Sequence, residues 1–246
     1  MSEAVDGTVA FTTPVVLAFP NLFEAKKFKG KGGKEQGEPK FGASFTLDPE
    51  SPDTKSLKSK AMQVAKAKWP GRDVAAESRP RVVTDEQGVS MTLPAKFAFP
   101  FKSGDKLCAE RVAKLAKEGK QDDGKGDFQK GKIVIKVSSK FQPRLAVIAG
   151  GKIVDLDTPE LITLHRGKFF FGAEVLLQVN VVGYDKVGDG GTDGVTIYPN
   201  LILATGKGTR LSGGASAAEV FKGYVGNISA EDPGSNADME DDMIPL

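Results

Sequence analysis

The chain has 246 residues, 39% of them hydrophobic, with 34 Lys and Arg, 32 Asp and Glu and a single histidine. This length and composition allow a folded core in one elaborated domain or in two small ones. The one cysteine, Cys108, has no partner for an internal disulfide, and Cys108 with His165 cannot supply a zinc cluster. We therefore expect no structural metal and no cofactor.

Segments with the composition of β-strands follow one another along most of the chain. The sequence predicts strands over Gly7 to Phe19 (with a break or edge at Pro14), Lys40 to Leu47, Val89 to Leu93, Lys132 to Phe141, Arg144 to Ile148, Lys152 to Asp155, Gly172 to Tyr184 and Gly194 to Leu203. Glycine and aspartate at Gly150-Gly151 and in the stretch 186–194 supply turns between them. We expect a mainly β protein of roughly seven or eight antiparallel strands.

Two amphipathic helices are predicted between the strands. Ser51 is a suitable N-cap for the first helix, and Pro52 suits its first position. The apolar face of this helix consists of Leu57, Ala61, Val64, Ala65 and Trp69. The second helix is expected over Asp105 to Glu118, and a third, short helix is expected over Ser216 to Tyr224.

Two stretches rich in lysine and glycine, Lys26 to Pro39 and Lys117 to Lys132, are expected to be flexible insertions. No run of about eighteen apolar residues occurs, and the first residues lack the basic-then-apolar layout of a signal peptide. We expect an intracellular protein that neither crosses a membrane nor is exported.

Acidic residues are concentrated at the C-terminus. Residues 229–246 hold six carboxylates and no Lys or Arg, so residues 1–228 carry all 34 basic residues, 26 acidic residues and a formal charge of +8. The terminal stretch also contains Gly, Pro, Ser and Asn, and it has little apolar surface to offset the cost of ordering it. We expect a folded basic domain over residues 1–228 and a disordered acidic tail over residues 229–246.

The tail ends in four residues with apolar side chains. A tail that only solubilises the protein has no need of an apolar tip, although solubilisation is the plain interpretation of an acidic terminus. We predict that the tail docks on partner proteins and competes weakly for the basic surface of the body. The residues of this docking segment are Asp238, Glu240, Asp241, Asp242, Met243, Ile244, Pro245 and Leu246.

Several clusters of Lys or Arg beside aromatic residues occur in the basic body. Such clusters suit single-stranded nucleic acid, because the cations contact phosphates and the ring faces stack on any base. The residues predicted to bind nucleic acid are Lys26, Lys27, Phe28, Lys29, Lys31, Lys40, Phe41, Lys136, Lys140, Phe141, Arg144, Arg166, Lys168, Phe170 and Tyr184. For each ring the alternative is packing in the core, and for the first Lys/Gly stretch it is a solvated hairpin tip.

Two aromatic runs add expectations about orientation. Phe97, Phe99 and Phe101 alternate with the period of a strand, so their rings would share one face beside Lys102. One ring of Phe169 to Phe171 would point outward if that run is extended. Both runs are further candidates for a stacking surface.

Catalytic motifs are weak in this sequence. His165 has no nucleophile near it, and Gly206 to Thr209 lacks the full spacing and the strand–helix context of a phosphate loop. The acidic pairs Asp122-Asp123 and Asp241-Asp242 lie in Gly-rich or acid-rich segments that cannot hold the geometry of a metal site. We expect that the protein is not an enzyme.

The order of several sequence blocks resembles a known family. An Asn-Leu-Phe-Glu element at Asn21 to Glu24 precedes the first Lys/Gly stretch, and EPKFGASF at Glu38 to Phe45 follows it, before a Pro/Asp-initiated helix. The blocks GAEVLLQVNVVGYD and GVTIYPNLILATGKG come late in the chain. Over about residues 5–205, this arrangement resembles the phage single-stranded-DNA-binding proteins once catalogued as the domain of unknown function DUF2815. Separately, Met239 to Leu246 resembles the acidic tail of bacterial single-stranded-DNA-binding proteins, which usually ends Ile-Pro-Phe, where this chain ends in leucine.

The resemblance implies an OB-fold, a five-stranded Greek-key barrel, enlarged here by extra strands, loops and two or three short helices. It also implies a protein that coats and protects single-stranded DNA without sequence specificity during phage DNA replication, recombination and repair. Such a protein would work in the cytoplasm of the infected bacterial host, recruit replication or repair proteins through its tail, and be able to form a homodimer. Gly172 and Gly194, in the late blocks, are interpreted as backbone positions and not as binding groups.

Two other functions fit the same sequence. A phage structural or scaffold protein could carry an acidic tail. A single-strand annealing protein would share the binding surface but would pair complementary strands. The sequence alone does not separate annealing from coating.

Overall fold

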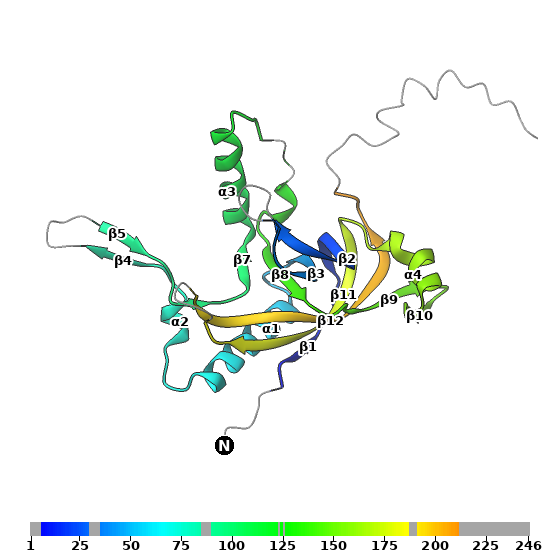
Figure 1. Cartoon of the computed structure of the whole chain (residues 1–246), viewed down its shortest axis with the longest axis horizontal. Helices are drawn as coiled ribbons and strands as arrows, with labels where there is room; N and C mark the ends of the chain where they lie inside the picture. The colour runs from blue at the N-terminus through cyan, green and yellow to red at the C-terminus, as the bar shows by residue number, and fades with distance from the viewer. Residues whose placement is uncertain are drawn as a thin grey trace, which may run out of the picture. The chain divides into compact units, whose positions relative to one another are not determined.

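The computed structural model describes residues 6–29, 35–84, 90–122, 124, 126–186 and 191–211 (Figure 1). The described residues are mainly β, as the sequence predicted, with twelve strands and four α-helices. The expected helix over Ser216 to Tyr224 and the expected acidic tail lie outside the described residues. No helix in this described part of the chain combines the length and the hydropathy that crossing a membrane requires.

The structure has more strands than the sequence predicted, and the additional strands are short. They are β1 (Thr8–Ala10), β2 (Val15–Lys29), β3 (Glu35–Leu47), β4 (Arg81–Thr84), β5 (Ser90–Leu93), β6 (Phe97–Ala98), β7 (Phe101–Ser103), β8 (Ile133–Ser139), β9 (Arg144–Ala149), β10 (Lys152–Asp155), β11 (Ala173–Tyr184) and β12 (Asp193–Gly208). The helices are α1 (Pro52–Lys68), α2 (Val74–Glu77), α3 (Gly104–Lys117) and α4 (Pro159–His165), with single 3-10 turns η1 (Asp127–Gln129) and η2 (Arg166–Lys168).

Ten strands form one sheet in the order β10-β9-β12-β11-β2-β3-β8-β7, with β1 paired to β11 and β6 paired to β12. The sheet curls, because β8 and β12, which are not neighbours in this order, also contact each other. β4 and β5 form a separate hairpin. Both β6 and β9 run parallel to β12, which corrects the expectation of antiparallel strands throughout. The alternation of side chains within a strand does not reveal the direction of its neighbours, so the sequence pattern could not show this.

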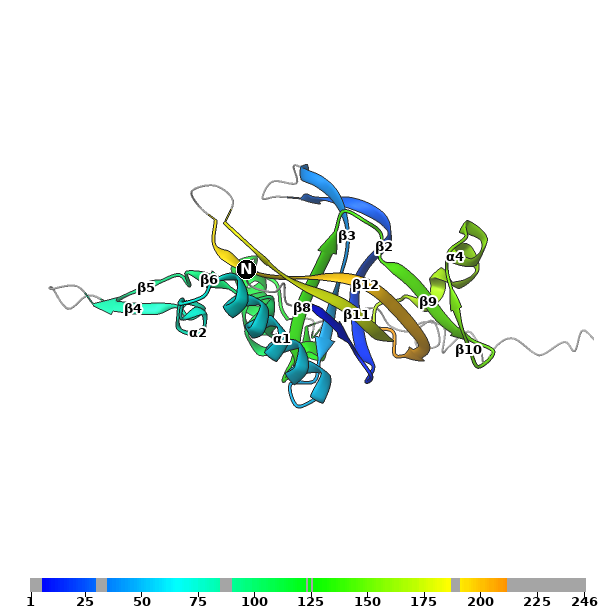
Figure 2. The same cartoon turned by 90° about the horizontal axis from the view of Figure 1, so that it is seen from below.

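The predicted strand over Gly7 to Phe19 is two strands, interrupted before Val15 in the region of Pro14. β2 then runs to Lys29 and β3 begins at Glu35, so much of the stretch predicted as a flexible insertion is a long hairpin (Figure 2). Its backbone groups pair across the two strands, for example Lys26 with Lys40. Polar side chains are tolerated there because the hairpin is exposed at this end.

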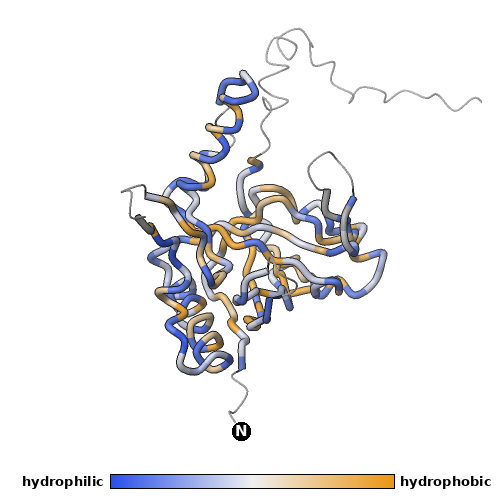
Figure 3. Tube along the Cα trace, turned by 60° about the vertical axis from the view of Figure 1, so that its left-hand side comes forward, coloured by the Kyte–Doolittle hydropathy of each residue, from blue (hydrophilic) through white to orange (hydrophobic). Residues whose placement is uncertain are grey.

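Helix α1 lies beside β11 and β12 (Figure 2). It begins at Pro52 as predicted, and Leu57, Ala61 and Ala65 on its inner face are fully buried. Apolar residues are concentrated along the strands of the sheet, where they form the core (Figure 3). Asp53, in the first turn of α1, accepts hydrogen bonds from the backbone of the β1–β2 connection. Helix α1 is therefore fixed to the sheet by apolar contacts and by this carboxylate.

Helix α3 starts one residue before the predicted position and projects from the sheet beside β7 (Figure 1). Only Gly104 and Cys108 are buried in it, so most of the apolar face expected of an amphipathic helix is at least partly exposed. Helix α4 was not predicted, although the sequence has a threonine at its N-cap, Thr158, and a proline in its first turn, Pro159. In the structure, the Thr158 side chain accepts a hydrogen bond from the amide of Leu161. These are ordinary helix-start signals that a seven-residue helix leaves easy to overlook.

The run Phe169 to Phe171 is not extended, so the condition for an outward-pointing ring is not met. The chain passes through η2 and a turn there, Phe169 is buried, and the next two rings are half-buried. Gly172 follows with a φ of 101°, and a Cβ at this residue would lie 1.9 Å from the carbonyl oxygen of Thr209. Only glycine fits at such a position, which confirms the interpretation of Gly172 as a position where the backbone conformation requires glycine.

Candidate nucleic-acid interface

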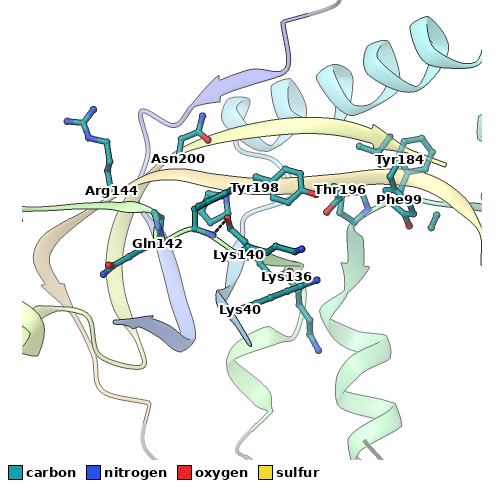
Figure 4. Close-up of a pocket in the computed structure, with 18 of the residues that line it drawn as sticks. Lys40, Phe99, Lys136, Lys140, Gln142, Arg144, Tyr184, Thr196, Tyr198 and Asn200 are labelled. Atoms are coloured by element: carbon teal, nitrogen blue, oxygen red, sulfur yellow. Dashed lines mark hydrogen bonds between the residues drawn. The ribbon is translucent and has the colours of Figure 1, made fainter. Parts of the chain in front are cut away.

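A cavity of about 930 Å³ opens between β8 with its following loop on one side and β12 on the other (Figure 4). We call it the groove. It gathers residues from five separate parts of the chain, including β3, the β6–β7 segment and the end of β11. Six of the residues predicted to bind nucleic acid line the groove: Lys40, Lys136, Lys140, Phe141, Arg144 and Tyr184.

One wall of the groove is β8. Val137 is buried in the core, whereas Lys136 and Ser138 on either side of it are exposed toward the groove. This alternation follows from the pleat of a strand with one face on the core. Lys136, which was predicted to bind nucleic acid, therefore lies on the open face of β8.

The opposite wall is β12, and the sequence predictions missed it. Val195 and Ile197 are buried, while Thr196, Tyr198 and Asn200 line the groove, and Tyr198 is 40% exposed. The same period-two alternation was present in the sequence as a signal. It was overlooked because no Lys or Arg adjoins Tyr198 in sequence.

The loop between β8 and β9 carries the most exposed ring of the site. Phe141 is 82% exposed, and its backbone amide donates a hydrogen bond of 3.0 Å to the hydroxyl of Ser139. The side chain of Gln142 donates to the carbonyl oxygen of Leu22 at 3.1 Å. The loop is therefore anchored to the sheet while its ring remains free to contact a ligand.

Phe99 supplies another ring, although its run does not form the single strand that was expected. β6 ends at Ala98 and β7 begins at Phe101, so the rings do not share one continuous strand face. Phe97 is buried in the core and contacts Phe99 at a centroid distance of 5.0 Å, while Phe99 itself lines the groove. The groove thus holds four aromatic residues: Phe99, Phe141, Tyr184 and Tyr198.

The groove is electropositive. Its lining includes five cationic side chains, Lys40, Lys102, Lys136, Lys140 and Arg144, and no Asp or Glu among the described residues. Arg144 pairs with Asp155 at 3.3 Å, and Lys140 pairs with Glu38. The other three lysines form no ion pair with a residue in the described ranges. Clustered cations produce a positive potential that attracts polyanions.

A second cavity, of about 590 Å³, lies at the base of the β2–β3 hairpin. We call it the hairpin cavity. It contains the predicted residues Lys26, Lys27 and Phe41, and it shares Lys40 and Ser138 with the groove. Phe28 and Lys29 lie at the end of β2, but their side chains are not described, and Lys31 lies outside the described residues. Lys26, Lys27 and Phe41 thus lie next to the groove.

The rim of the groove at the start of β12 is held by charged residues. Arg72, after α1, pairs with Asp193 at 2.7 Å and with Glu77. The backbone amide of Lys186 and the Arg72 side chain both donate to the Asp193 carboxylate and lower its pKa. A Cβ at Gly194 would lie 2.5 Å from the carbonyl oxygen of Ala98, so only glycine allows β6 and β12 to approach this closely. This agrees with the interpretation of Gly194 as a position that the backbone path restricts to glycine.

Three other predicted residues lie away from the groove, around α4 and η2. The guanidinium of Arg166 lies over the ring of Phe23 at 5.5 Å, and the ring of Phe170 is covered by Arg210 at 4.8 Å. The ammonium of Lys168 donates to the carbonyl oxygen of Ile148 at 2.8 Å. With the buried Phe169, these residues form what we call the aromatic cluster: Phe23, Arg166, Lys168, Phe169, Phe170 and Arg210.

Residues with catalytic potential do not converge on the groove. His165 is half-buried at the end of α4, and burial raises the pKa of the Cys108 thiol, which disfavours the reactive thiolate. Among the described residues, no three His, Cys, Asp or Glu side chains lie together as a candidate metal site. The groove lining is instead suited to binding through charge and stacking.

Comparison with known proteins supports the fold. No protein-family model matches the chain, and no curated protein matches it by sequence. The single-stranded DNA-binding protein from bacteriophage Enc34 has a similar structure, with a TM-score of 0.50 and 13% identity over 89% of this chain and 90% of that chain. Its complex with single-stranded DNA gives a TM-score of 0.49, with 14% identity over 83% and 89% of the two chains. The gp2.5 single-stranded DNA-binding protein of bacteriophage T7 gives 0.39, with 9% identity over 89% and 97%.

The Enc34 likeness at a TM-score of 0.50 shows a shared fold. The chain is therefore an elaborated OB-fold, as the sequence resemblance implied, with its barrel strands extended into a ten-stranded sheet.

Proposed function

We propose that this protein binds single-stranded DNA in the groove, with little preference for sequence. The observation that carries the proposal is the lining of the groove, which combines five cations and four aromatic residues with no acidic residue among the described positions. Lysine and arginine contact phosphates along a strand, and aromatic faces stack on any base. Exposed bases are available for stacking in a single strand but not in an intact duplex.

The fold supports the same proposal. The Enc34 protein, which has a similar fold, is described as a single-stranded DNA-binding protein. OB-folds hold single strands across one face of the barrel, between loops and strands that carry basic and aromatic residues. The groove lies on such a face, between β8 and β12. We include Lys26, Lys27 and Phe41 of the hairpin cavity in the proposed binding surface, because this cavity adjoins the groove.

The biological setting is part of the proposal. We infer a phage protein of the DUF2815 family that coats and protects single strands during DNA replication, recombination and repair in the cytoplasm of the infected host. The acidic tail over residues 229–246 recruits replication or repair proteins, with the carboxylates steering the approach and the apolar tip giving the buried contact. Coating a strand requires no catalysis.

A fluorescence-anisotropy titration tests the proposed binding. Labelled oligo-dT should bind more tightly than a blunt duplex of equal length. The logarithm of its affinity should fall with the logarithm of salt concentration, by about 0.7 per phosphate neutralised. Equal affinity for both DNAs, or no dependence on salt, would contradict the proposal and favour a structural or scaffold protein. Acceleration of pairing between complementary strands would identify annealing activity in addition to coating.

Two tail variants test partner recruitment. Deleting residues 229–246 should abolish capture of replication or repair proteins from infected-cell extract and should raise DNA affinity, most at low salt, where competition is least screened. Replacing Ile244 and Leu246 with alanine keeps all six carboxylates. This variant should lose the partners without changing DNA affinity. A deletion variant that keeps its partners and its DNA affinity would indicate a tail that only solubilises.

A further inference from the structure

The groove and the hairpin cavity adjoin at two residues, which we call the joint. Lys40 and Ser138 line both cavities, so a strand that follows the cations from one to the other must pass them. An ion pair crosses this joint. Glu38, on β3, lines the hairpin cavity, and Lys140, just after β8, lines the groove.

Glu38 is the one acidic residue among the described residues that line either cavity. Its carboxylate is 64% exposed and the Lys140 side chain is 60% exposed, so neither group is required by the core. The hydrogen bond from Lys140, together with the charges of Lys140 and Lys40, lowers the pKa of Glu38. The carboxylate is therefore ionised at neutral pH, and it places a negative charge where the rest of the lining is positive.

We propose that Glu38 occupies the position on Lys140 that a strand phosphate takes, and so acts as an internal competitor that sets the affinity of the groove. The inference rests on the proposed function. A phosphate oxygen can accept the same charge-assisted hydrogen bond from an ammonium group as a carboxylate oxygen does. Exposed ion pairs contribute little stability, so exchanging one anion for another at Lys140 costs little free energy. Binding of a strand across the joint then releases Glu38 from Lys140.

A single substitution should expose this competition. Glu38→Gln keeps the size of the side chain and removes the charge. Binding of oligo-dT long enough to span both cavities should become about two- to five-fold tighter at low salt, which is the range expected for losing one exposed ion pair. The gain should shrink as salt rises, because added ions screen the carboxylate as well.

A double-mutant cycle separates local competition from a general change of charge. Anisotropy titrations with labelled oligo-dT would compare the wild type, Glu38→Gln, Lys140→Ala and the double variant. Glu50→Gln is the matched control, because Glu50 also forms an exposed pair on the surface, with Lys55 at 2.8 Å, and its loss changes net charge equally. Thermal melting checks that every variant is folded. Glu38→Gln should tighten binding only when Lys140 is present, and Glu50→Gln should leave binding unchanged.

The alternative outcomes overturn the inference. Unchanged or weaker binding by Glu38→Gln means that the carboxylate does not compete. An equal gain in the Lys140→Ala background, or from Glu50→Gln, means that only total charge matters. The wild-type titration by itself decides the proposed function. If the wild type binds oligo-dT and Glu38→Gln is inert, the role of Glu38 falls while the function stands, and if the wild type does not bind, both fall.

Discussion

The groove and the aromatic cluster are built from similar residues and use them differently. In the sequence, both contain Lys or Arg directly beside phenylalanine. In the groove, Phe141 is 82% exposed and Lys136 forms no ion pair with a described residue. In the aromatic cluster, Phe169 is 4% exposed and Arg166 lies over the ring of Phe23.

The difference shows that a basic–aromatic cluster in sequence has two structural uses. A cation placed over a ring from another segment joins those segments, and its charge is partly satisfied by the ring face. A cation on the outward face of a strand, with a ring on a neighbouring loop, is available to a ligand. Which use applies depends on contacts between residues far apart in the chain, such as Phe23 with Phe169.

The strongest test of this comparison is removal of the buried ring. Phe169→Ala should lower the free energy of unfolding by about 3–5 kcal/mol, because a large buried side chain is replaced by a cavity. Urea denaturation followed by circular dichroism measures this loss. DNA affinity should be retained under conditions where the variant is still folded. A variant as stable as the wild type would show that the aromatic cluster does not support the fold.

Removal of an exposed groove ring should have the opposite effect. Phe141→Ala should weaken oligo-dT binding by about 1–3 kcal/mol, the range for losing one base–aromatic stack. Its free energy of unfolding should stay near that of the wild type, because the ring is 82% exposed. Phe141→Leu is the control, since it keeps apolar bulk but has no ring face. If Phe141→Leu binds as well as the wild type, stacking is not the interaction, and early unfolding of Phe141→Ala would mean that the ring supports the fold.

Local sequence pattern predicted the elements better than their arrangement. The composition that predicted the strand carrying Lys136, and Pro52 at the start of α1, are properties of neighbouring residues. The pairing of Arg144 with Leu201, which brings the β9 end of the groove to β12, joins residues that no local pattern connects. Tyr198 could have been predicted from alternation within its strand, but the joining of the groove to the hairpin cavity could not.

The smallest and most discriminating effect concerns two lysines, one in each region. Lys136→Ala should reduce the salt dependence of oligo-dT binding by about 0.7 in the slope of log affinity against log salt, which corresponds to one phosphate contact. Lys168 was also predicted to bind DNA, but in the structure its ammonium donates to the carbonyl oxygen of Ile148. Lys168→Ala should leave the slope unchanged if the strand follows only the groove. Lys66→Ala, on the exposed side of α1, controls for the loss of one positive charge. A slope reduced equally by Lys136→Ala and Lys168→Ala would show that the strand also contacts the aromatic cluster, and the separation of the two regions into binding and packing would then be wrong.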